Sequence, residues 1–235
     1  MSDEKQSVAL ITGASRGLGL ALARKLASQG WHLVLDARHP AALEKAAQEL
    51  SAHTRVTAIP GDVTSPDHRQ ALVDAVSTLG GLDALVNNAS LLGPSPQPEL
   101  LEYPLDVLEQ VYRVNVFAPL ALIQELRPQL KSGAVIVNVS SDAGVEAYEG
   151  WGGYGSSKAA LEHLSAILAV ENPQWRVYWV DPGDMRTQMH QEAYPGEDIS
   201  DRPLPEASVP GLMALLTAGL PSGRYRAREM SQVVE

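Results

Sequence analysis

The chain has 235 residues, 45% of them hydrophobic, and a formal net charge of −10 with a sequence pI near 5.0. This length allows one large α/β domain or two small ones, and no stretch of the sequence has the composition of a linker. An acidic chain repels nucleic acid and anionic membranes, and the absence of cysteine excludes disulfides, thiolate metal sites and a cysteine nucleophile.

The amino-terminal residues 1–7 lack the apolar core that a signal peptide needs. No apolar run approaches the roughly 18 residues of a membrane span. We therefore expect a soluble, cytoplasmic protein without nucleic-acid or membrane partners, built as a single domain over residues 1–235.

Short apolar runs alternate with segments of helical periodicity along the chain. The predicted strands are Val8 to Thr12, Trp31 to Ala37, Arg55 to Ile59, Ala84 to Val86, Ala134 to Val139, Arg176 to Val180 and Gly223 to Ala227. The predicted helices cover residues 17–29, 40–51, 66–79, 100–130, 153–170 and 206–219. This repeat predicts an α/β fold, a doubly wound Rossmann-type domain whose parallel sheet of about seven strands has helices on both faces.

Two segments interrupt this pattern. Pro119 and Pro128 should kink or break the helix predicted over residues 100–130. Residues 184–205 are polar, contain several prolines and show no periodicity, which predicts a mobile substrate flap beside a ligand site.

A glycine-rich turn, Thr12-Gly-Ala-Ser-Arg-Gly-Leu-Gly19, follows the first predicted strand and opens the first helix. Glycines let the backbone approach a pyrophosphate, and a helix amino terminus supplies N–H donors, so a dinucleotide is the expected ligand. The same residues spell GxSxG, the nucleophile elbow of α/β-hydrolases. That fold needs an oxyanion-hole loop before the elbow, and twelve residues are too few to carry one.

Tyr154 and Lys158 lie four residues apart at the start of a predicted helix, on one helix face. A cation beside a phenol favours the phenolate, by roughly 4 kcal/mol at about 4 Å in an effective dielectric of about 20. Such a pair occurs on many solvated helices by chance. Its meaning depends on the motifs around it.

Six motifs in the same order resemble those of the classical short-chain dehydrogenase/reductase family, and of its carbonyl reductases in particular. They are TGxxxGxG at residues 12–19, Asn87-Asn88-Ala89, Asn115, Ser141, Tyr154-xxx-Lys158 and Pro182-Gly183-xxx-Thr187. The resemblance spans roughly residues 7–190. It implies a domain that binds a nicotinamide dinucleotide and transfers a hydride to or from a carbonyl or alcohol carbon.

The resemblance also implies a catalytic role for each of four residues. Tyr154 would be the acid/base, and Lys158 would lower its pKa and hold the nicotinamide ribose. Ser141 would hydrogen-bond the substrate oxygen, and Asn115 would support a proton-relay water. Ser140 is the other serine candidate, but strand alternation places it on the opposite face, and the spacing from Ser141 to Tyr154 matches the family better.

Cofactor preference depends on the end of the second strand, where the family places an acid for NAD. That position is Ala37, followed by Arg38, while Arg16 lies in the glycine turn. Two arginines suit a 2′-phosphate, so NADP is favoured. Asp36 leaves NAD as an alternative cofactor, because a shift of one residue would bring its carboxylate to the ribose hydroxyls. The alternative role for Asp36 is a salt bridge to Arg38 or Arg16.

The expected cofactor contacts continue along the carboxyl edge of the sheet. The complete predicted set is Gly13, Ser15, Arg16, Gly17, Leu18, Gly19, Ala37, Arg38, Asp62, Val63, Asn88, Ala89, Tyr154, Lys158, Pro182, Gly183 and Thr187. One residue departs from the family pattern. Ser90 stands where a glycine usually follows Asn-Asn-Ala, and its small size should make it tolerable.

Aromatic residues gather in the segments with which the family walls its substrate pocket. Tyr148, Trp151 and Tyr194 indicate an apolar or aromatic substrate, with loop packing as the alternative. Asp181 could contact the substrate or have a structural, hydrogen-bonded role. A polar cluster in the flap lacks the spacing of metal ligands, which predicts solvated side chains and no metal; its members are His190, Glu192, Glu197, Asp198 and Asp201.

The sequence therefore predicts an NADP(H)-dependent oxidoreductase acting on a small-molecule carbonyl or alcohol. The alternatives are a non-catalytic dinucleotide-binding sensor or scaffold, and an epimerase or lyase that uses the same tyrosine and lysine. From the family resemblance we also expect a homo-oligomer, with a dimer preferred, that pairs through the helices predicted at 100–130 and 153–170.

Overall fold

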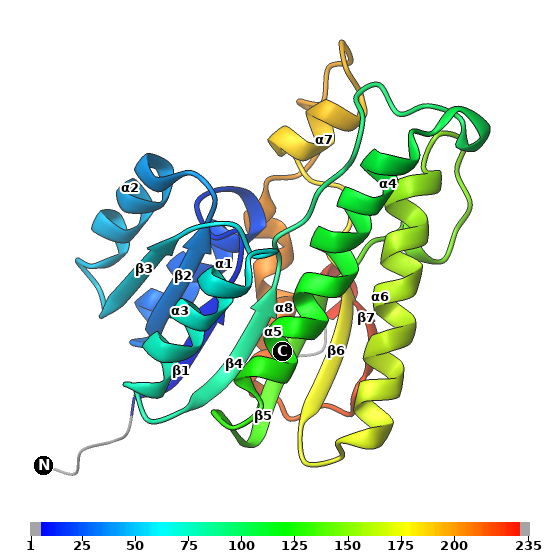
Figure 1. Ribbon diagram of the computed structural model, residues 1–235. Helices are drawn as coiled ribbons and strands as arrows, with labels where there is room; N and C mark the ends of the chain where they lie inside the picture. Colours follow the sequence, from blue (N-terminus) through cyan, green and yellow to red (C-terminus); the bar gives the residue numbers. More distant parts are fainter. Residues whose placement is uncertain (1–5, 231–235) are drawn as a thin grey trace, which may run out of the picture.

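The computed structural model describes residues 6–230. Seven parallel strands form one sheet in the order β3-β2-β1-β4-β5-β6-β7, so the predicted doubly wound sheet is confirmed (Figure 1). The strands are β1 (Val8–Ile11), β2 (His32–Ala37), β3 (Val56–Pro60), β4 (Leu82–Asn87), β5 (Leu130–Val139), β6 (Arg176–Asp181) and β7 (Gly223–Arg226). The strand order reverses between β1 and β4, where folds of this kind bind ligands at the carboxyl edge.

Helices cover both faces of the sheet. The α-helices are α1 (Gly17–Ser28), α2 (Pro40–Leu50), α3 (Pro66–Ser77), α4 (Leu105–Tyr112), α5 (Ala118–Leu126), α6 (Gly152–Glu171), α7 (Gln188–Ala193), α8 (Val209–Thr217) and α9 (Ala227–Met230). Shorter elements are the 3₁₀ helices η1 (Leu100–Glu102), η3 (Asp142–Gly144) and η4 (Pro205–Ser208) and the π-helical turn η2 (Arg113–Phe117).

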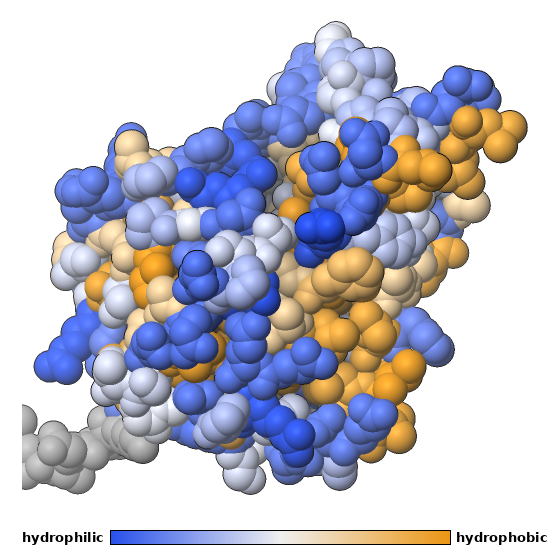
Figure 2. Space-filling view, viewed as in Figure 1, coloured by the Kyte–Doolittle hydropathy of each residue, from blue (hydrophilic) through white to orange (hydrophobic). Residues whose placement is uncertain are grey.

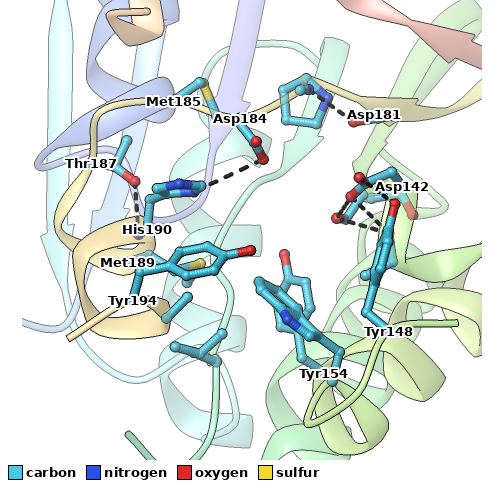
Figure 3. Close-up of a pocket in the computed structure, with 18 residues that line it drawn as sticks. Asp142, Tyr148, Tyr154, Asp181, Asp184, Met185, Thr187, Met189, His190 and Tyr194 are labelled. Carbon is cyan, nitrogen blue, oxygen red and sulfur yellow. Dashed lines mark hydrogen bonds and ion pairs between the residues drawn. The ribbon is translucent and has the colours of Figure 1, made fainter. Parts of the chain in front are cut away.

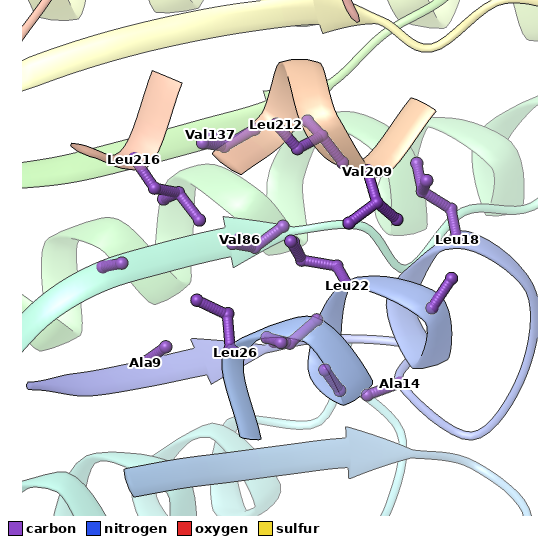
Figure 4. Close-up of a cluster of buried hydrophobic side chains, with 14 of the residues drawn as sticks. Ala9, Ala14, Leu18, Leu22, Leu26, Val86, Val137, Val209, Leu212 and Leu216 are labelled. Carbon is purple, nitrogen blue, oxygen red and sulfur yellow. The ribbon is translucent and has the colours of Figure 1, made fainter. Parts of the chain in front are cut away.

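The alternation of side chains along β1 shows why both faces are apolar. Ala9 and Ile11 pack in one buried cluster with residues of α1 and α8 (Figure 4), while Val8 and Leu10 pack in a second cluster with residues of α3 and α5. Because successive side chains of a strand point to opposite faces, a strand covered on both sides must be apolar throughout.

The helix predicted over residues 100–130 is wrong in its extent and in its break at Pro119, whereas the break at Pro128 is confirmed, since α5 ends at Leu126. The chain forms η1, α4, η2 and α5 in turn, and β5 already begins at Leu130. Pro119 lies in the first turn of α5, where its missing N–H breaks no helical hydrogen bond. The interruption is instead the π-helical turn that contains Asn115.

Residues 184–205 are also more regular than predicted, since they include α7. Thr187 caps this helix by accepting a hydrogen bond from the backbone N–H of His190 at 3.2 Å. Arg16 in the glycine turn donates to the Oε1 of Gln188, at the start of α7. In Figure 1, α7 lies beyond the carboxyl ends of the strands, so this segment covers the edge where the glycine turn begins.

A buried pair joins β2 to α3. Nε2 of His68 lies 2.7 Å from Oδ1 of Asp36, and the two residues are 8% and 2% exposed. Burial raises the pKa of Asp36, against hydrogen bonds from His68 and from the backbone of Gly13. The prediction that Asp36 pairs with Arg38 or Arg16 is therefore wrong.

Replacing His68 by alanine should lower the free energy of unfolding by roughly 3–5 kcal/mol, because it leaves a buried carboxylate without its partner. The folded-state pKa of Asp36 is raised, so protonation of Asp36 favours the fold. The loss should therefore shrink as pH falls toward the ordinary pKa of aspartate. Urea unfolding of the wild type and of His68→Ala at two pH values measures this loss of free energy.

The exposed His163 on α6 provides the matched control, and His163→Ala should change the free energy of unfolding by less than about 0.5 kcal/mol. Equal losses in the two variants would show that the His68–Asp36 pair does not stabilise the fold.

Candidate active site

A cavity of about 380 Å³ opens at the carboxyl edge of the sheet (Figure 3). Its walls come from the ends of β5 and β6, from η3, from the start of α6 and from α7. Figure 3 shows Tyr194 on the wall formed by α7 and Asp142 with Tyr148 on the opposite wall, with Tyr154 between them. The topology thus brings Leu92, residues of the segment 140–154 and residues of the segment 181–194 to one cavity.

The glycine turn lies beside this cavity in a form that suits an anionic ligand. Gly13 and Gly17 have φ angles of 65° and 57°, which favour glycine. A Cβ on Gly19 would lie 2.6 Å from Nδ2 of Asn88. Within residues 6–230, no side chain caps the start of α1, so its first N–H groups are free to bind a phosphate. These residues fit a dinucleotide pyrophosphate.

Asn88 supports the glycine turn from behind. Its Nδ2 donates to the carbonyl oxygens of Thr12 and Gly13, at 2.9 and 3.1 Å. The Oγ1 of Thr12 accepts from the backbone N–H groups of Asn88 and Ala89, both at 3.0 Å. The side chain of Asn88, predicted to contact the cofactor, thus holds the turn in shape.

The end of β2 presents arginine and not aspartate. Ala37 is buried and Arg38 is exposed, whereas the carboxylate of Asp36 is turned inward to His68. Nearby, Asp62 accepts two hydrogen bonds from Thr64, at 2.8 and 2.7 Å. Despite partial burial, these bonds and the charge of Arg38 lower the pKa of Asp62.

The remaining predicted cofactor residues differ in what they can offer a ligand. The side chains of Leu18 and Val63 lie in the two large apolar clusters, so only their backbones are available. Gly183 has a φ of 72°, and its N–H donates to Oδ1 of Asp181 at 2.8 Å. Pro182 and Thr187 line the cavity, while Ser15 is only partly buried in the glycine turn.

Tyr154 and Lys158 lie together, and both are buried. Lys158 Nζ is 5.4 Å from the centroid of the Tyr154 ring and donates to the carbonyl oxygen of Val139 at 2.8 Å. Burial lowers the pKa of Lys158 to about 7, against the attraction of Glu162. Burial also raises the pKa of Tyr154, which reverses the shift expected from the sequence. Desolvation of the buried phenol is the largest cause, and the charges of Asp142 and Asp181 add to it.

The two serines have different surroundings. Ser141 lines the cavity, where its hydroxyl donates to Oδ1 of Asp142 at 2.8 Å. The hydroxyl of Ser140 is directed to the buried Glu162, at 2.6 Å, and Arg224 pairs with the same carboxylate at 3.1 Å. Ser140 also lines the cavity, but its hydroxyl belongs to a polar network with Glu162 and Arg224.

Asn115 uses all the hydrogen-bonding capacity of its side-chain amide. Its Oδ1 accepts from the N–H of Leu91 at 2.8 Å and from the hydroxyl of Ser90 at 3.2 Å. Its Nδ2 donates to the carbonyl oxygen of Leu91 at 2.9 Å and to Oγ of Ser157 at 3.0 Å. The π-helical turn thus connects the end of β4 to α6.

The wall opposite η3 includes residues that the sequence pattern did not identify. Met185 and Met189 line the cavity with His190, whose ring lies 4.9 Å from that of Tyr194 between centroids, tilted by 43°. The prediction that His190 is solvated is wrong, since its side chain is 10% exposed and burial lowers its pKa. The cap formed by Thr187 was the local sign of a helix here.

The aromatic residues that the sequence did single out all line this cavity. The ring of Trp151 lies 5.7 Å from that of Tyr154 and 6.0 Å from that of Tyr194. With Tyr148 on the opposite side, they make the cavity suited to flat or apolar groups.

Comparison with known proteins agrees with this geometry. A benzil reductase ((S)-benzoin forming) of Saccharomyces cerevisiae is 35% identical over 195 residues, which cover 79% of this chain and 74% of that protein. The 3-oxoacyl-acyl-carrier-protein reductase of rhamnolipid biosynthesis in Pseudomonas aeruginosa is 34% identical over 235 residues, 95% of this chain and 86% of that protein.

A solved short chain dehydrogenase structure from Shigella flexneri, described as complexed with NADP, superposes with a TM-score of 0.88. Its sequence is 29% identical, and the match covers 94% of this chain and 97% of that one. The profile of the short chain dehydrogenase family matches residues 7–198. With its parallel sheet, glycine turn and buried tyrosine and lysine, the chain belongs to the short-chain dehydrogenase/reductase family of oxidoreductases.

Proposed function

We propose that this protein is an NADP(H)-dependent carbonyl reductase that acts on a small molecule, with Tyr154 as the acid/base. The observation that carries the proposal is the shared cavity of Ser141 and Tyr154, with Lys158 buried against the tyrosine ring. A bound nicotinamide dinucleotide supplies the hydride in this chemistry. The protein's part is to bind the substrate oxygen and to move one proton.

The protonation state of Tyr154 favours the reductive direction. Because burial raises its pKa, the phenol holds its proton at neutral pH and can give it to an oxygen that gains negative charge. Ser141 would donate a second hydrogen bond to that oxygen. Lys158, with a pKa near 7, can take up or release a proton behind the tyrosine.

Three features support NADP over NAD. Arg38 is exposed at the end of β2, Arg16 lies in the glycine turn, and the carboxylate that would favour NAD is bound to His68. The Shigella flexneri structure described with NADP has the same fold. We propose that the glycine turn holds the pyrophosphate, Asp62 and Val63 the adenine, and Pro182, Gly183 and Thr187 the nicotinamide end.

The substrate should carry an apolar or aromatic group. Trp151, Tyr194 and Tyr148 supply flat surfaces, and the yeast relative is named for benzil, an aromatic diketone. Residues 184–205 contribute Met185, Thr187, Met189, His190 and Tyr194 to the wall, which supports their role as a substrate flap.

The first test is turnover. A panel of aromatic and aliphatic ketones should oxidise NADPH in the presence of the protein, and Tyr154→Phe should lower kcat/KM at least about 1000-fold, because it removes the proton donor. Fluorescence titration should give a Kd for NADPH within about threefold of the wild type. Unchanged activity in the variant would remove the proposed mechanism.

The same panel separates the alternatives. A sensor or scaffold would bind NADPH without oxidising it in the presence of any carbonyl. An epimerase or lyase would convert substrate with no net change in cofactor absorbance.

The second test concerns the cofactor. Arg38→Ala should raise the KM for NADPH about tenfold or more and leave the KM for NADH nearly unchanged, since the guanidinium recognises only the 2′-phosphate. Arg127→Ala, an exposed arginine at the end of α5, is the matched control. Equal effects of Arg38→Ala on both cofactors would contradict the NADP assignment.

We also propose a cytoplasmic homodimer that pairs through α4, α5 and α6. Large apolar side chains are exposed along these helices and in η2 between α4 and α5, with Leu105 at 77%, Phe117 at 55% and Val170 at 83%. Figure 2 shows apolar surface on the side of the molecule where α4 and α6 lie in Figure 1. Across the described part of the chain, no helix is long and apolar enough to cross a membrane.

Introducing charge into this face should separate the subunits. Phe117→Asp combined with Val170→Asp should weaken the dimer at least about 100-fold in sedimentation velocity, because two carboxylates would be buried at the interface. Leu204→Asp, which alters an exposed leucine outside these helices, should leave the dimer intact. A wild-type protein that sediments as a monomer would contradict the proposal.

A further inference from the structure

Arg224 belongs to β7, the last strand of the sheet, yet its side chain reaches the strand end that carries the candidate serine. In the sheet, Arg224 is aligned with Trp179 of β6, and Trp179 is aligned with Asn138 of β5. Asn138 donates to Ser165 of α6. Because aligned side chains on neighbouring strands share a face, Arg224 lies on the side of the sheet that α6 covers.

The guanidinium of Arg224 joins three elements. Its Nε donates to both carboxylate oxygens of Glu162 on α6, at 3.1 Å each. Its Nη2 donates to the backbone carbonyl oxygen of Ser141 at 3.1 Å and lies 3.9 Å from Oδ2 of Asp181 at the end of β6. Glu162 also accepts a hydrogen bond from the hydroxyl of Ser140 at 2.6 Å. The Arg224–Glu162 pair therefore holds α6 against the ends of β5 and β6.

Burial makes the charges of this pair important. Glu162 is 7% exposed and the side chain of Arg224 is 23% exposed. Glu162 lies one helical turn after Lys158, on the same face of α6, and its negative charge favours the ammonium form of the lysine. Arg224 partly neutralises that carboxylate. The charge that Lys158 meets from Glu162 thus depends on a residue of the last strand.

We propose that Arg224 is a positioning residue for the proton-transfer groups, whose guanidinium fixes the backbone of Ser141 and limits the negative charge that Glu162 presents to Lys158. The inference rests on the proposed function, in which Ser141 and Lys158 assist the reaction at Tyr154. Neither Arg224 nor Glu162 belongs to the six sequence motifs, so the pair adds a second layer to the motif residues.

Other charged and titratable groups near this network come from three further places. Tyr154 lies beside Lys158 on α6, and the charge of Asp142 in η3 acts on Tyr154. Asp181 at the end of β6 also lies 3.9 Å from Nε of Arg226. All of these groups remain when the Arg224–Glu162 pair is altered. A changed affinity of the lysine for its proton can then be assigned to the pair.

The effect on Lys158 can be measured without turnover, by labelling the lysines with ¹³C at Cε and following their resonances with pH. The resonance of Lys158 is the one that disappears in Lys158→Met. Glu162→Gln should lower the midpoint of its titration by about one pH unit, because an opposite charge is lost. Arg224→Met should raise the midpoint, because the carboxylate is then balanced by Lys158 alone. A general loss of packing would not give shifts of opposite sign.

Two further variants make this test specific. Arg24→Met breaks an exposed arginine–glutamate pair between α1 and α2, with Nε and Oε1 2.6 Å apart, and should leave the midpoint of Lys158 in place. In the Glu162→Gln background, the effect of Arg224→Met should fall below half, since it acts through the carboxylate. This double variant leaves no unpaired carboxylate to oppose folding. Shifts of the same sign in the two single variants, or no shift in either, would overturn the proposal.

Kinetics with NADPH and an active ketone test the positioning of Ser141. Arg224→Lys keeps a positive charge beside Glu162 but cannot reproduce the forked contacts of the guanidinium. It should leave the titration of Lys158 near that of the wild type and lower kcat at least about tenfold, with the KM for NADPH within about twofold, because a displaced serine is felt in the transition state. An unchanged kcat in both Arg224→Lys and Arg224→Met would refute the positioning of Ser141.

The outcomes separate the two proposals. No turnover by the wild type with any carbonyl would refute the proposed function, whereas the titration of Lys158 would still decide whether the pair sets the charge at the lysine. Turnover by the wild type, with the midpoint of Lys158 unmoved in Glu162→Gln and Arg224→Met, would refute the role of the pair alone.

Discussion

Buried polar groups at the carboxyl edge of the sheet must find hydrogen-bond partners, and this requirement determines the arrangement of the site. Asn87 donates to Asn138 across β4 and β5 at 2.8 Å, and Asn138 donates to Ser165 of α6 at 2.7 Å. An unpaired amide in such a place would cost about 1–3 kcal/mol. The edge is therefore held by side-chain amides, each of which connects one element to the next.

The same requirement explains why the cavity has its shape. Asn88 supports the glycine turn, and Asn115 joins the end of β4 to α6 through the π-helical turn. A regular helix through residues 113–117 would turn the Asn115 side chain to another direction, because each residue of an α-helix is rotated by about 100°. Insertions of this kind are frequent at functional sites.

Desolvation is the main electrostatic influence in the site. It raises the pKa of Tyr154 and lowers that of Lys158, so both groups favour their neutral forms. The buried Glu162, paired with Arg224, attracts the lysine charge from below. The balance between burial and a few neighbouring charges thus decides where the proton resides.

The sequence alone was sufficient for the strands, most of the helices and the identity of the motif residues, because periodicity and turn chemistry are local properties of the chain. Tertiary structure decided the rest. Asp36 meets His68 across 32 residues, and Asn115 meets Ser157 across 42. Which buried group faces which partner depends on how parallel crossovers bring distant segments to one edge, and the pKa of each group depends on that burial. Neither the partner of a buried group nor its pKa can be predicted from a local sequence pattern.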